Sequence, residues 1–210
     1  MSHAEQRKTQ DDKPLIFQGE MLALDLVNTE VMRRGQRHDL LTTPQDVVHW
    51  WQATCQHHPE LDGGSGTNED TTVYDQALLD ALKTLRTALR AIFDALVAEK
   101  TPEMADISVL NAVLRTNYTA LEYSAQGDLV PMVRTTNTTQ GLVLAPIALS
   151  ALSLISQGER KRLHRCENER CILFFYDTTR SATRRWCSLA CMDRARSSRR
   201  YHQAKQHTTS

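Results

Sequence analysis

Four of the five cysteines in this 210-residue chain lie close together near its C-terminus. Cys166 and Cys171 are separated by four residues, Cys187 and Cys191 by three, and fifteen residues lie between the pairs. The first pair encloses a short polar turn, and the second pair lies one helical turn apart at the start of a predicted helix. Four thiolates can therefore meet at one point, which is typical of a structural Zn²⁺ site without an open coordination position.

Two other uses of these cysteines stay open. An iron–sulfur cluster also takes four thiolates, although this spacing is not a ferredoxin spacing, and disulfides form in oxidising compartments. The polar residues 1–13 do not resemble a signal peptide, and no segment approaches the ~18 consecutive apolar residues of a membrane-spanning helix. We therefore expect a soluble, cytoplasmic protein and favour zinc as the cofactor.

The segments around the cysteines predict how the thiolates are positioned. The polar turn between Cys166 and Cys171 is followed by the strand-like sequence ILFFYD, and Cys187 precedes a helical pattern. A knuckle, a hairpin and a helix in this order predict a treble-clef zinc finger. The positive end of the helix dipole would help to hold the thiolate charge.

The zinc-finger segment is also basic, although the formal net charge of the chain is zero. Residues 1–157 hold 12 Lys and Arg against 20 Asp and Glu, whereas residues 158–210 hold 13 against 5. Guanidinium groups offer paired donors that fit phosphate oxygens, so we predict DNA as a partner. Protein docking and a merely solvated surface remain alternatives. The residues predicted to bind nucleic acid are Arg180, Arg184, Arg185, Arg194, Arg196, Arg199 and Arg200.

The N-terminal part of the chain predicts a mostly helical domain. Apolar spacing indicates helices from about residue 20 to Gly35, over 44–57, over 73–99, from Pro102 onward, and from Pro146 to Gly158. The sequence around Gln126-Gly127-Asp128 predicts a β-hairpin. The expected fold class is α+β, with a tail at 1–13, a helical domain at 14–157, the zinc finger at 158–202 and a tail at 203–210.

Polar residues on the first predicted helix are the second candidate site. Asp25, Asn28 and Thr29 fall close together on an otherwise apolar segment. They would bind a small-molecule effector or, as we prefer, form a buried polar cluster that satisfies neighbouring backbone groups. The chain has no glycine-rich phosphate loop, HExxH motif or serine elbow, so we expect no enzyme. A homodimer is a further expectation for this domain.

Two segments resemble known families. The sequence CILFFYDTTRSATRRWCSLACMDRARSSRRY resembles the CGNR zinc finger, and GEMLALDLVNT with LLTTPQDVVHWW is similar to the ABATE domain that accompanies this finger. The resemblance spans about residues 15–201 and implies a stress-related transcription regulator. The chain departs from the Cys-Gly-Asn-Arg motif that names the finger, because Cys-Met-Asp-Arg stands at 191–194. Its last two cysteines are also one residue closer together than in the commoner version of the finger.

Overall fold

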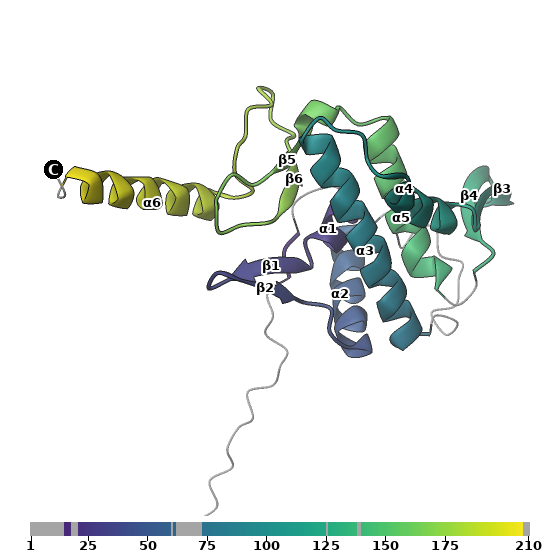
Figure 1. Cartoon of the computed structure of the whole chain (residues 1–210). Coiled ribbons are helices and arrows are strands. Elements are labelled where there is room, and N and C mark those ends of the chain that lie inside the picture. The colour runs from purple at the N-terminus through teal and green to yellow at the C-terminus, as the bar shows by residue number, and fades with distance from the viewer. Residues whose placement is uncertain are drawn as a thin grey trace, which may run out of the picture.

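The computed structural model describes residues 15–17, 21–59, 61, 73–124, 126–137 and 140–207, except for the side chains at 133, 199 and 201–207. The described part combines helices with three two-stranded antiparallel sheets, an α+β architecture dominated by helices (Figure 1). The helices are α1 (Leu22–Val27), α2 (Pro44–His57), α3 (Gln76–Val97), α4 (Met104–Leu114), α5 (Gly141–Ser156), the 3-10 helix η3 (Arg160–Arg162) and α6 (Leu189–His207). The strands are β1 (Glu30–Arg33), β2 (Gln36–Asp39), β3 (Asn117–Tyr123), β4 (Leu129–Thr135), β5 (Leu163–Arg165) and β6 (Phe174–Tyr176).

The long helix α3 is the centre of the main core. Its leucines at three- and four-residue spacing form a buried stripe, and the helix packs against α1, α2 and α4. The carboxylate of Asp75 caps its first turn by accepting a hydrogen bond from the Leu78 backbone N–H at 2.9 Å. The apolar stripe of α3 is therefore buried within the core of this chain.

The two Thr-Pro sequences behave differently, although both predict a helix start. The first begins α2 as predicted, because Thr43 and Asp46 form a reciprocal capping box. The predicted start at Thr101 and Pro102 is wrong, since α4 begins at Met104. The third residue after Thr101 is Met104, which has no side-chain acceptor to complete a capping box.

The predicted helix from residue 20 to Gly35 is also wrong beyond Val27. The chain leaves α1 at Asn28 and forms the β1–β2 hairpin, in which Arg33 pairs with Gln36 across a two-residue turn. Every residue of α1 is buried, so apolar periodicity does not mark where the helix ends. Gly35, with φ +81°, is a hairpin-turn residue and not a helix end.

The remaining elements follow the predicted order with shifted boundaries. The hairpin β3–β4 forms around Gly127, and α5 begins at Gly141, five residues before the predicted start at Pro146. The helix α6 includes residues 203–207, which begin the predicted C-terminal tail, while residues 1–13 of the N-terminal tail lie outside the described part. No helix in the described part is long and apolar enough to cross a membrane.

Candidate metal centre

The sulfur atoms of Cys166, Cys171, Cys187 and Cys191 all lie within 4.8 Å of one another. The Sγ atoms of Cys187 and Cys191 are 3.5 Å apart, and those of Cys171 and Cys187 are 3.8 Å apart. A disulfide requires about 2.05 Å between its sulfurs, so all four are free thiols here. An ion ~2.3 Å from each sulfur holds tetrahedral ligands about 3.8 Å apart, and the cluster therefore fits a single Zn²⁺ ion.

Local hydrogen bonds place the first two cysteines. Strand β5 pairs with β6, and the connection between them contains Cys166 and Cys171. The backbone N–H of Cys166 donates to the Leu173 carbonyl at 2.9 Å, and that of Cys171 donates to the Asn168 carbonyl at 2.8 Å. We call residues 166–171 the knuckle. The sequence predicts a hairpin after the knuckle, but β5 precedes Cys166 and β6 follows Cys171, so the β5–β6 hairpin encloses the knuckle. The treble-clef class stays a prediction.

The second pair lies at the start of α6. Cys191 is in the first turn, where its backbone N–H donates to the Ser188 hydroxyl at 3.2 Å. The Cys187 N–H points at the Cys166 sulfur, 3.5 Å away. The carboxamide of Asn168 then joins the two halves by donating to the Cys191 carbonyl at 2.8 Å. Asn168 is buried and is a positioning residue that cysteine spacing does not reveal.

The loop between β6 and Cys187 is organised by Asp177, which is fully buried. Its carboxylate accepts hydrogen bonds from the Thr179 N–H at 2.9 Å, the Thr179 hydroxyl at 2.6 Å and the Arg184 N–H at 2.8 Å. Burial alone would raise the pKa of the Asp177 carboxyl, but these hydrogen bonds outweigh it and hold that pKa below its usual value. The loop therefore carries a stable internal anion.

The thiols of the cluster influence one another's ionisation. Hydrogen bonds from the Cys171 and Cys187 thiols lower the pKa of Cys166, and the same contacts with Cys166 raise the pKa values of Cys171 and Cys187. Zinc binds thiolates and therefore displaces the protons that these groups share. The Arg194 guanidinium donates to the Cys191 sulfur at 3.1 Å and offsets part of the negative charge of a tetrathiolate site.

The zinc module is packed against the N-terminal domain. A small apolar cluster joins Val31 of β1 and Leu40, which follows β2, to Leu173, Phe175 and three of the cysteines. Arg90 of α3 donates to the Ile172 carbonyl at 3.0 Å and to the Val27 carbonyl at 2.6 Å. The two parts of the chain thus share buried contacts, and the hairpin β1–β2 lies next to the metal centre.

The residues of the second candidate site also lie among the buried contacts that join the two parts of the chain. Asp25, Asn28 and Thr29 are each at most 2 % exposed. The Asp25 carboxylate lies 2.7 Å from the His58 ring, Asn28 bonds to Phe174 of β6, and Thr29 accepts a hydrogen bond from Arg86. Sequence reasoning missed His58, which lies 33 residues from its partner. The binding of an effector by these residues stays a prediction.

The predicted nucleic-acid residues fall into two groups. Arg184 is bound to the module itself, because it donates to the Trp186 and Cys187 carbonyls and covers the Phe175 ring. Arg185 is exposed but pairs with Glu167. Arg180, Arg196 and Arg200 are exposed as well. Arg194 is exposed but touches the Cys191 sulfur, and the side chain of Arg199 lies outside the described part.

Comparison with known families agrees with the two resemblances. The ABATE family model, described as "Putative stress-induced transcription regulator", matches residues 20–158, and the CGNR zinc finger model matches residues 162–205. A comparison with curated proteins gave no match. With the finger family and the sulfur geometry in agreement, the four cysteines constitute a zinc-binding site. Because the first model covers more than half of the sequence, the chain belongs to the ABATE family and carries a C-terminal CGNR zinc finger.

Proposed function

We propose that this protein is a DNA-binding transcription regulator in which the zinc site fixes the start of α6 and α6 lies against the duplex. One observation carries the proposal. Figure 1 shows α6 leaving the zinc module and extending away from the rest of the molecule. Cys191, a metal ligand, is in its first turn, and Arg196 and Arg200 are exposed further along the helix.

The composition of α6 supports a charged partner. The helix has 19 residues, is rich in polar residues from Asp193 onward and has arginines at positions 194, 196, 199 and 200. A helix that is polar on most sides gains little from packing, and packing supplies most of the stability of helices in proteins. The major groove of B-DNA admits an α-helix. Phosphates on both sides of that groove would neutralise the arginines and stabilise the helix.

The arginines take different roles in this proposal. Arg184 and Arg185 bind within the module and set the shape of the loop before Cys187. Arg180, Arg196 and Arg200 have exposed side chains that can reach phosphates, and Arg199 belongs with them by its position on α6. Contacts of this kind position a protein on DNA without reading its sequence.

The alternative of a zinc-stabilised protein-docking module requires an acidic partner. The acidic N-terminal domain of the same chain contacts the finger through Arg165, which pairs with Asp94 of α3, but among the described side chains no arginine of α6 is ion-paired with it. An acidic surface on another protein remains the competing outcome of the experiment below.

Other parts of the proposal concern the N-terminal domain. A small-molecule effector near Asp25 and Asn28, or a homodimer, would couple a signal to the zinc finger. The proposed function includes no enzymatic step. A cytoplasmic location follows from the proposed access to DNA.

Fluorescence polarisation with a labelled duplex, over a range of salt concentrations, tests this function. We expect the affinity to fall steeply with salt and the slope of log K against log salt to lose about 0.9 for each phosphate contact removed. Arg196→Ala and Arg200→Ala should each show this loss. Arg160→Ala, an exposed arginine on η3, is the control of equal charge. Absence of binding at low salt, or equal slopes in all variants, would favour protein docking.

A further inference from the structure

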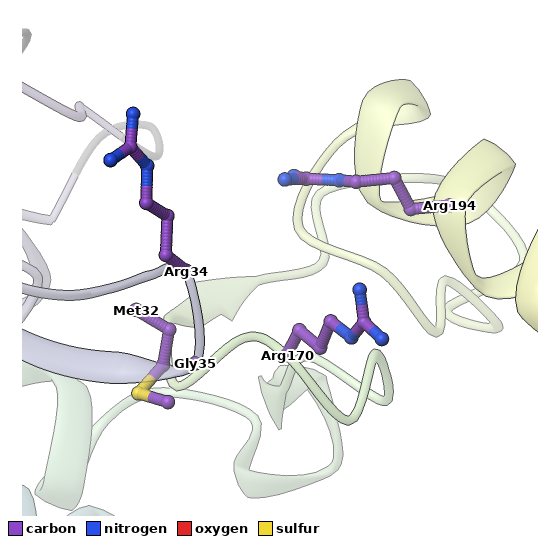
Figure 2. Close-up of a pocket in the computed structure, with 5 residues that line it drawn as sticks. All are labelled: Met32, Arg34, Gly35, Arg170 and Arg194. Carbon is purple, nitrogen blue, oxygen red and sulfur yellow. The ribbon is translucent and has the colours of Figure 1, made fainter.

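Three arginines from three separate elements line one cleft beside the zinc centre. Arg34 belongs to the β1–β2 turn, Arg170 to the knuckle and Arg194 to α6, and Met32 and Gly35 also line the cleft. Figure 2 shows Arg34 and Arg170 on two sides of the opening, while Arg194 reaches across from the helix. Two of these arginines thus come from the zinc finger and one from the N-terminal domain.

The cleft is suited to an anion. Its volume of about 470 Å³ exceeds the ~30 Å³ that one water molecule occupies in the liquid by more than tenfold, so a hydrated phosphate group fits. No carboxylate is among the lining residues that the structure describes. The acidic residues next to these arginines in the sequence, Glu169 and Asp193, are exposed outside the lining. Arg194 already donates to the Cys191 sulfur at 3.1 Å. Like charges that share one opening repel one another, and an anion in the cleft would offset the charges of Arg34 and Arg170.

The backbone at Arg34 adds an independent observation. Arg34 has φ +51° and Gly35 has φ +81°, and the two residues join paired strands. A two-residue hairpin turn with both φ values positive favours Asn, Asp or Gly at its first position. Arginine is a poor choice for this backbone conformation. Its side chain, however, is the only basic group that the N-terminal domain contributes to the described lining of the cleft.

We propose that this cleft is a phosphate-binding site and that its occupant is a backbone phosphate of the DNA. Planar guanidinium groups bind phosphate oxygens through paired N–H donors, and three of them surround this opening. Because α6 begins at the same cleft, a phosphate held there would fix where the helix enters the duplex. The N-terminal domain would then contact DNA directly through Arg34. This inference builds on the DNA-binding function proposed above, and its test separates the two.

The test measures duplex binding by the full-length, zinc-loaded protein in a salt series. We expect Arg34→Asn and Arg170→Gln to weaken binding at low salt and to reduce the salt slope by about 0.9 each. Arg37→Gln is the matched control, because Arg37 lies on the same hairpin and outside the cleft lining. The melting temperature of Arg34→Asn should equal or exceed that of the wild type, since asparagine suits the turn. Lost binding therefore cannot be ascribed to unfolding.

A titration with inorganic phosphate, followed by the NMR amide signals of Gly35 and the knuckle, is the second arm. If the wild type binds duplex and all three variants bind with the same slope, the cleft proposal is overturned while the DNA-binding function stands. If the duplex does not bind but phosphate shifts these signals in the wild type and not in Arg34→Asn, the site stands and takes a free phosphate compound. If the wild type binds neither the duplex nor inorganic phosphate, both the DNA-binding function and the phosphate site are overturned.

Discussion

The carboxamide of Asn28 pairs with the backbone of Phe174 as a neighbouring strand would. Its Nδ2 donates to the Phe174 carbonyl at 2.9 Å, and its Oδ1 accepts from the Phe174 N–H at 2.9 Å. Both residues are at most 1 % exposed, and 146 positions separate them in the sequence. The end of α1 thereby completes the hydrogen bonding of the strand that follows the knuckle.

We predict that Asn28→Asp uncouples the zinc finger from the N-terminal domain. Aspartate has the same shape but lacks the N–H donor, and it places a carboxylate oxygen against the Phe174 carbonyl. The loss of a buried hydrogen bond with one partner left unsatisfied costs about 1–3 kcal/mol, and the midpoint of urea unfolding should fall accordingly. The control is Gln52→Glu, the same chemical change at an exposed position of α2. Equal midpoints in the two variants would contradict the pairing.

The zinc site predicts a sharp difference between two cysteine variants. Cys187→Ser should lose the single zinc ion and unfold the module, because one of four ligands is gone and structural zinc supplies much of the folding free energy of such sites. Cys55→Ser is the matched control, since Cys55 lies on α2 outside the cluster. Elemental analysis should give one zinc per chain for the wild type and for Cys55→Ser. A folded, zinc-free wild-type protein would contradict the assignment.

The cysteine cluster could be predicted from the sequence, whereas the framework around it could not. Cysteine spacing and a helical pattern are local signals, and they were sufficient to predict that the four sulfurs lie close together. The contacts of Asn28 with Phe174 and of Arg90 with Ile172 join residues 146 and 82 positions apart. No local periodicity encodes such pairs, because they depend on how the helices and strands pack against one another.

The same limit explains the errors in the N-terminal domain. The helix α1 is buried on all sides, so its apolar residues give no amphipathic boundary, and the Arg34-Gly35 turn resembles a helix end in sequence. At α2 the prediction was confirmed because Thr43 and Asp46 encode the cap locally. The roles of the arginines also depend on packing, since Arg184 and Arg180 are only four positions apart but differ in their contacts.

We predict that Arg184 and Arg180 separate folding from binding. Arg184 donates to the Trp186 carbonyl at 2.8 Å and lies 4.7 Å from the centre of the Phe175 ring. Hydrogen bonds from a charged group contribute about 1.5–3 kcal/mol, so Arg184→Gln should unfold at lower urea and release zinc faster to a chelator. Arg180→Gln should keep the stability of the wild type and weaken duplex binding. A chelator-release rate that is the same for both variants would contradict the structural role of Arg184.

The pairing of Asp39 with Arg86 predicts a pH-dependent contribution to stability. The two groups are joined by hydrogen bonds of 2.6 and 2.7 Å. Burial alone would raise the pKa of Asp39, but the hydrogen bond and the charge of Arg86 outweigh it and lower that pKa. A carboxyl with a lowered pKa in the folded state stabilises the protein above its unfolded pKa of ~3.9, and this contribution is lost as the pH falls through the folded pKa.

Near neutral pH, Asp39→Asn should therefore lower the free energy of unfolding by about 1.5–3 kcal/mol, because Arg86 loses the nearer of its two carboxylate partners, Asp39 and Glu30. The difference between the wild type and the variant should begin to shrink as the pH falls below the unfolded pKa of ~3.9, where the unfolded carboxyl takes up its proton, and it should be lost below the lowered pKa of the folded carboxyl. Urea unfolding at a series of pH values measures this difference, and zinc release in acid affects both proteins alike. Asp80→Asn, at an exposed position of α3, should differ little from the wild type throughout. If the Asp39→Asn difference persists undiminished at the lowest pH at which the protein folds, the ion pair is not its source.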